Sequence, residues 1–171
     1  MTDTLTLDNS NNAVFGGDVD VSAGSGITFD SGTNYLDDYE EGEHTATITP
    51  NTSGTVTLDS TNDILSYEKI GDFVHVHGRL DVDSVSSPTG FFRISLPFTP
   101  ADDTGLGERS AASIFVNSTS AANISDFVAE LTASAAELNV YLGDGTSVQT
   151  DSAQELSASS TITLSVSYQT T

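Results

Sequence analysis

The feature that most constrains the fold of this chain is a period-two alternation of apolar and polar residues. Residues 43–49 (EHTATIT), 54–58 (GTVTL) and 161–168 (TITLSVSY) alternate threonine or serine with apolar residues, as half-buried antiparallel strands do. The clearest such segment runs from residue 72 to residue 85. Its alternation predicts one apolar face with Val74, Val76, Leu80 and Val82, and one polar face with His75, His77, Arg79, Asp81 and Asp83.

Helical patterns are almost absent, because serine, threonine, glycine and β-branched residues are frequent throughout. The best exception is Asn123–Leu138, where Ser125 could cap a helix. In that segment Phe127, Ala129 and Leu131 also alternate with their neighbours, and we favour a strand followed by a turn. Turn signals recur at the spacing expected of sandwiches: residues 51–54, 60–63, 70–72, 87–90, 102–107 and 143–145. The sequence therefore predicts an all-β protein with a jelly-roll-like antiparallel β-sandwich head over residues 37–171.

Residues 1–36 have a different character. They contain three short strand-like pieces, Leu5–Asp8, Val14–Val21 and Ile27–Asp30, each too polar to bury a core of its own. Three copies wound about an axis could share an apolar interior, to which this segment would contribute Leu5, Leu7, Val14, Phe15, Val19, Val21, Ile27 and Phe29. We therefore predict a short, intertwined N-terminal β-shaft or attachment segment in a homotrimer.

The charge balance is extreme, with 25 acidic residues against four basic ones and a net charge of -21. Such a surface excludes nucleic acid as a direct partner. Because the acids are dispersed among alternating apolar residues, they indicate an acidic folded surface rather than a disordered tail. Aspartate outnumbers glutamate and there is a single lysine. This composition suggests a halophilic setting, in which salt screens the self-repulsion.

Several other classes of structure are disfavoured. No segment approaches the roughly 18 apolar residues of a membrane helix, and we expect no membrane insertion. The polar, acidic start of the chain lacks the pattern of a secretory signal. The sequence contains no cysteine, which excludes disulfides and thiolate metal sites.

The densest acidic cluster lies in residues 34–50, NYLDDYEEGEHTATITP. We interpret it as the solvated junction between shaft and head, where Tyr35, Leu36 and Tyr39 anchor the chain and Gly42 lets it turn. The acids expected to stay in water are Asp37, Asp38, Glu40, Glu41 and Glu43. A glycosidase carboxylate pair and a calcium site are the two less favoured readings of the same residues.

His75 and His77 are the candidate metal ligands, because their spacing places both imidazoles on one face of a strand. Three copies about a trimer axis would offer six nitrogens to an octahedral transition metal. We favour exposed histidines or an ordinary subunit interface, and hence no metal, no cofactor and no catalytic residue. The glycine-containing loop of residues 102–108 carries three acids and no lysine, so it would repel phosphate.

Three segments resemble the C-terminal modules of tail-fibre and related virion fibre proteins of tailed viruses, many of them marine. NYLDDYEEGEHTATITP is similar to the family's Leu-Asp-Asp-Tyr-Glu-Glu-Gly-Thr-Trp-Thr-Pro junction, YEKIGDFVHVHGRLDV to its Tyr-x-Lys-Ile-Gly strand entry, and RISLPFTP to a third motif. Together they span roughly residues 34–100. The chain departs from the pattern at His44-Thr45-Ala46, where the family usually has Thr-Trp-Thr.

The resemblance implies a non-enzymatic, homotrimeric virion structural protein exposed on the particle surface. Its N-terminal segment would attach to other tail or capsid proteins. Loops at the far end of the head would bind a host surface glycan or surface protein, as expected of a tail fibre or receptor-binding protein. The alternatives are a capsid head fibre or decoration protein and, less favoured, the glycan hydrolase of a tailspike.

Overall fold

A computed structural model describes residues 17–20, 27–28, 35–36, 38–102, 109–120, 126–133, 135–143 and 148–170. The chain divides into two compact units, Met1–Asp37 and Asp38–Thr171. In the first unit, β1 (Ile27–Thr28) pairs antiparallel with β2 (Tyr35–Leu36). Val19, one of the residues predicted to line the shared interior of a trimer, is 52% exposed in the single chain. The predicted piece Leu5–Asp8 lies outside the described residues, and the intertwined shaft stays a prediction.

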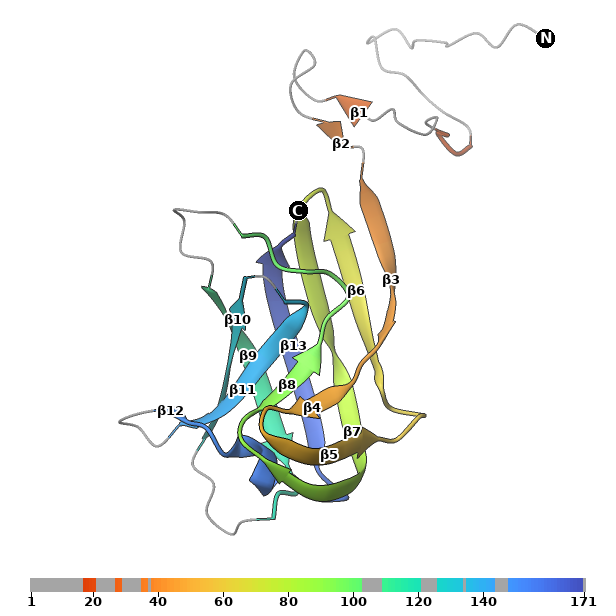
Figure 1. Ribbon diagram of the computed structural model, residues 1–171. Coiled ribbons are helices and arrows are strands. Elements are labelled where there is room, and N and C mark those ends of the chain that lie inside the picture. The colour runs from red at the N-terminus through yellow and green to blue at the C-terminus, as the bar shows by residue number, and fades with distance from the viewer. Residues whose placement is uncertain are drawn as a thin grey trace, which may run out of the picture. The chain divides into compact units, whose positions relative to one another are not determined.

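The second unit is built from strands (Figure 1). In chain order they are β3 (Tyr39–Thr45), β4 (Ile48–Pro50), β5 (Ser53–Leu58), β6 (Ile64–Ile70), β7 (Phe73–Thr89), β8 (Phe92–Ser95), β9 (Arg109–Asn117), β10 (Asp126–Thr132), β11 (Glu137–Gly143), β12 (Val148–Gln149) and β13 (Thr161–Gln169). Within the described residues the one helical element is a 3₁₀ turn, η1 (Ser152–Glu155). Among the described residues, no helix is long and apolar enough to cross a membrane. The all-β prediction is confirmed.

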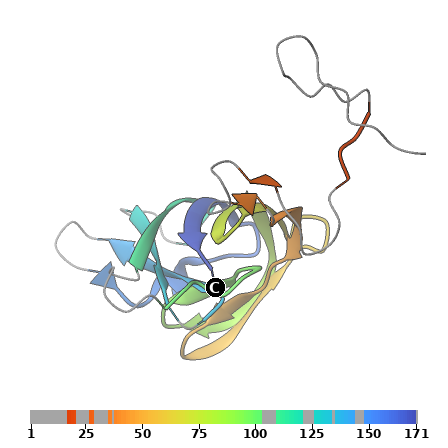
Figure 2. The ribbon, with the colours of Figure 1, turned by 90° about the horizontal axis from the view of Figure 1, so that it is seen from above.

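The strands form one antiparallel sheet in the order β3-β6-β7-β13-β9-β10-β11-β8-β4, with β12 beside β11 and β5 beside β7. Two strands, β7 and β9, change their pairing partners part of the way along their length. The first part of β9 pairs with β10 and the second part with β13, while β7 pairs with β6 and β13 and then with β5. The sheet consequently curls over itself, with β8 and β11 facing β7 and β13 across the core (Figures 1 and 2). A jelly-roll-like topology and the trimer stay predictions.

The interior of the curled sheet holds one apolar core. Its largest fully buried side chains are Phe92, Leu65, Leu80, Ile94, Leu131, Leu138, Ile162, Val74, Val76 and Val140. The predicted faces of β7 are confirmed, because Val74, Val76, Leu80 and Val82 are all buried while His77 and Arg79 are exposed. Residues 126–132 form β10, as the favoured strand reading predicts.

The predicted strand over residues 43–49 is instead two strands, separated at Ala46 and Thr47. β3 pairs with β6 at one edge of the sheet, and β4 pairs with β8 at the other. The crossing is held by Ser95, whose hydroxyl lies 3.0 Å from Nε2 of His44 and accepts a hydrogen bond from the Thr47 amide at 2.9 Å. Ala46 is buried. Ala46 and Thr47 thus carry the chain from one edge of the curled sheet to the other.

Candidate functional site

The predicted histidines lie on a β-hairpin whose register brings in a third residue. β6 and β7 are joined by a two-residue turn, in which Gly71 adopts a φ of 57° that favours glycine. The hairpin pairs Ile70 with Phe73 and therefore Glu68 with His75. Because residues directly opposite in a sheet point to the same face, Glu68 and His75 share the outward face of the sheet.

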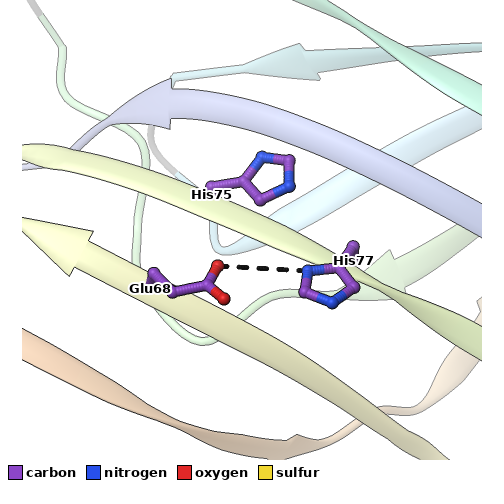
Figure 3. Close-up of side chains that lie close together, drawn as sticks. All are labelled: Glu68, His75 and His77. Carbon is purple, nitrogen blue, oxygen red and sulfur yellow. Dashed lines mark ion pairs between the residues drawn. The ribbon is translucent and has the colours of Figure 1, made fainter.

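Glu68, His75 and His77 together form what we call the His–Glu cluster (Figure 3). One nitrogen or oxygen atom from each side chain lies within 4.8 Å of the other two. The two imidazole rings stack, with centroids 5.4 Å apart and an interplanar angle of 27°. Nδ1 of His77 is 4.0 Å from a Glu68 carboxylate oxygen, the pair joined by the dashed line in Figure 3. His77 and Glu68 are about half exposed.

The neighbouring strand orients one of the rings. His75 lies opposite Ser167 of β13, and its Nδ1 atom is 2.9 Å from the Ser167 hydroxyl. On the other side of the cluster, Glu41 of β3 lies opposite Glu68. The next basic residue along β7, Arg79, donates two hydrogen bonds to Asp81 at 2.8 and 3.0 Å.

Two imidazoles and one carboxylate form a donor set that suits borderline transition metals, whereas Mg²⁺ and Ca²⁺ prefer all-oxygen sites. From sequence alone we identified His75 and His77 but missed Glu68 and Ser167. The signal that identifies Glu68 is the turn at Gly71 and Asp72, since a two-residue loop fixes the pairing of β6 with β7.

The acidic junction lies mainly on β3, at the edge of the sheet. Its predicted solvation is confirmed for Asp38, Glu40, Glu41 and Glu43, which are all exposed, while Asp37 lies outside the described residues. Successive residues of a strand point to opposite faces of the sheet, so the side-chain carboxylates of Glu40 and Glu41 do not point toward a common site. Charged side chains on an edge strand protect it from pairing with other chains.

Two predictions about junction residues are wrong. Tyr39 is 59% exposed and so is no buried anchor; its hydroxyl donates to Glu41 at 2.8 Å. This hydrogen bond, with the adjacent negative charge, raises the pKa of Tyr39. Gly42 makes no turn and lies within β3, where a Cβ atom would lie 2.6 Å from the Tyr67 hydroxyl oxygen. The glycine leaves room for the Tyr67 ring of the neighbouring strand.

A second outward surface, which we call the aromatic face, comprises Phe91, Val128 and Tyr141. The rings of Phe91 and Tyr141 are 4.8 Å apart and tilted by 42°, and Val128 lies opposite Tyr141 between β10 and β11. Arg93, bound to Glu137 at 3.1 Å, alternates with the buried residues of β8 and is partly exposed, as Phe91 is. The surface combines apolar rings with polar side chains.

Neither a family model nor a curated protein matches this chain. A solved structure does, that of the Dettilon tailspike protein gp208, with a TM-score of 0.62 and 22% sequence identity. The match covers 77% of this chain and 24% of the tailspike chain. The chain thus shares its fold with a part of a phage tailspike and corresponds to about a quarter of that protein's length.

Proposed function

We propose that this protein is a trimeric fibre component of a tailed virus and that its curled β-sheet unit binds the host cell surface without catalysis. The observation that carries the proposal is the fold shared with part of a phage tailspike. The segments similar to tail-fibre junctions, within residues 34–100, support the same assignment. The N-terminal segment attaches the fibre to other virion proteins.

Within the part of the chain that the structure describes, the aromatic face is the surface that we assign to a host glycan. Sugar-binding sites combine aromatic rings with a few polar groups that fix the orientation of the ligand. Phe91 and Tyr141 supply adjacent rings, and the Arg93–Glu137 pair supplies charged hydrogen-bonding groups beside them.

An acidic fibre meeting an acidic cell surface is repelled at low salt, and a saline medium removes that repulsion.

A capsid head fibre or decoration protein is the second candidate. Immunogold labelling of purified virions with an antibody to this chain separates the two. Label on the tail is expected. Label on the capsid shell would overturn the tail assignment in favour of the second candidate, and absence of label from the particle would overturn the virion assignment itself.

Oligomeric state is tested by sedimentation equilibrium of the full chain at micromolar concentration. A homotrimer sediments at about three times the 17.8 kDa mass of one chain. A species at the single-chain mass would contradict the trimeric fibre.

Host binding is tested with fluorescently labelled protein and cells that the virus infects. The double variant Phe91→Ala/Tyr141→Ala should bind at least about tenfold more weakly, since aromatic anchors dominate binding surfaces. Phe115→Ala is the matched control, because Phe115 is a 65% exposed aromatic residue on a different strand, β9. Equal binding by both variants would exclude the aromatic face as the host-binding surface.

Release of reducing sugar from host polysaccharide would instead support a hydrolase.

A further inference from the structure

We propose that Glu68, His75 and His77 of a single chain bind a divalent transition-metal ion, with Zn²⁺ as the reference ion. The site differs from the trimer-axis arrangement in that every protein ligand comes from one hairpin. It is also independent of host binding, because these residues lie on β6 and β7 whereas the aromatic face lies beside β8, β10 and β11.

The donor atoms are already close to a binding arrangement. They lie within 4.8 Å of one another, and donors in a tetrahedral zinc site are roughly 3.3 Å apart, given bonds of about 2.0–2.1 Å. Side-chain rotation can close this difference, because Glu68 and His77 are half exposed and not locked by packing. The backbone of the paired strands holds the three Cα atoms in fixed register.

Ser167 supplies the outer contact that such a site requires. A metal-bound imidazole usually donates its second N–H to a neighbouring acceptor, which fixes the ring and its tautomer. The Ser167 hydroxyl is 2.9 Å from Nδ1 of His75 and can accept that hydrogen bond, leaving Nε2 of His75 to bind the metal. Ser167 is therefore a positioning residue.

The surrounding charges favour a cation. Glu41 lies beside Glu68 on the same face, and the whole chain carries a net charge of -21. Arg79, the next basic residue on β7, is engaged by Asp81. Three protein ligands on an exposed surface leave at least one coordination position for water or an external ligand.

The proposal is tested by isothermal titration of Zn²⁺ into the full-length protein, in millimolar Mg²⁺ that saturates non-specific carboxylate binding. We expect one ion per chain. His75→Ala and His77→Ala should each weaken Zn²⁺ binding by about 100-fold or more, because each removes a metal ligand. Glu68→Gln and Ser167→Ala should each weaken it by about tenfold. Substitutions of outer-shell partners in metal sites typically cost 10–100-fold in metal affinity. Co²⁺ provides a second readout, because its visible absorption intensifies when imidazoles replace water in a site of low coordination number.

Glu41→Gln is the matched control, since it removes one negative charge beside the cluster without removing a ligand. Its Zn²⁺ affinity should change by less than that of Glu68→Gln. Circular dichroism and the thermal unfolding midpoint, measured without metal, identify any variant that fails to fold. One ion per three chains, unaffected by Glu68→Gln, would overturn the single-chain site in favour of the trimer axis. Absence of Zn²⁺ binding in the presence of Mg²⁺ would overturn both.

Discussion

At the scale of single residues, Gly42 shows how a missing side chain makes room for a ring from the neighbouring strand. The Tyr67 ring lies over Gly42, donates its hydroxyl to Glu40 at 2.6 Å, and packs edge-to-face on Phe98 at 5.1 Å. A methyl group at position 42 must displace this ring. The glycine of the acidic junction is thus a packing requirement of the β3–β6 pair.

We predict that Gly42→Ala lowers the free energy of unfolding by about 1–3 kcal/mol, as overpacking does. Urea denaturation followed by tyrosine fluorescence measures the change. Gly17→Ala is the control, because nothing lies within 4 Å of the Cβ position at Gly17. A stability loss in Gly17→Ala as large as in Gly42→Ala would show that the effect comes from glycine replacement in general.

His44 gives a pH dependence of known sign. Burial lowers the pKa of His44 below its usual 6.5, and the hydrogen bond with Ser95 offsets part of this effect. The unfolded chain therefore takes up a proton at a higher pH than the folded chain. The stability that neutral His44 contributes is complete above pH 6.5 and is lost as the pH falls below that value.

The His44→Gln variant should consequently lose less stability than the wild type between about pH 7 and pH 5. The quantity to measure is the difference in unfolding free energy between the two proteins at each pH, since the carboxylates contribute equally to both. An identical pH profile for the two proteins would contradict a depressed His44 pKa.

At the scale of elements, the end of β13 fastens the segment that follows β8. Tyr168 donates its hydroxyl to the Phe98 carbonyl at 3.0 Å, and Thr170 donates to the Thr99 carbonyl at 2.8 Å. The Ala101 amide donates to the Gln169 carbonyl at 2.7 Å. Burial raises the pKa of Tyr168 to about 12, so the phenol stays neutral and keeps donating.

Tyr168→Phe should lower the free energy of unfolding by about 1–3 kcal/mol at neutral pH, because the Phe98 carbonyl loses its donor. The raised pKa adds a second expectation: wild-type stability declines as the pH rises above the usual tyrosine value of 10.0. The variant should decline less over that range, as measured by chemical denaturation. A steeper decline in the variant would contradict the burial argument.

The His–Glu cluster belongs to the same scale, because it depends on how two strands pair. Alternation alone places His75 and His77 together, since both belong to one strand. Glu68 joins them only when the two-residue turn sets the register, and Ser167 only when β13 pairs with β7. The last pairing joins residues far apart in sequence, and no local pattern specifies it.

At the scale of the whole molecule, the dominant property is charge. A net charge of -21 on 171 residues destabilises the compact state through self-repulsion. Salt shortens the Debye length from about 10 Å at 0.1 M to about 3 Å at 1 M and so relieves the repulsion.

We therefore predict that the thermal unfolding midpoint rises with NaCl concentration, on the order of 5 °C between low salt and about 1 M. Differential scanning calorimetry measures this rise. Sucrose at equal osmolarity is the control, since it stabilises by exclusion without screening charge. A midpoint independent of salt would count against the halophilic interpretation.

The sequence by itself determined the all-β class, the two faces of β7, the strand at residues 126–132 and the solvation of the acidic junction. Each follows from a local property, either the period-two alternation or the cost of burying charge. Only the tertiary structure decided that the chain runs from one edge of the sheet to the other at Ala46 and Thr47, that Gly42 accommodates Tyr67, and that Ser167 lies beside His75. These features depend on pairings between distant strands, which the closing of the curled sheet around one core selects.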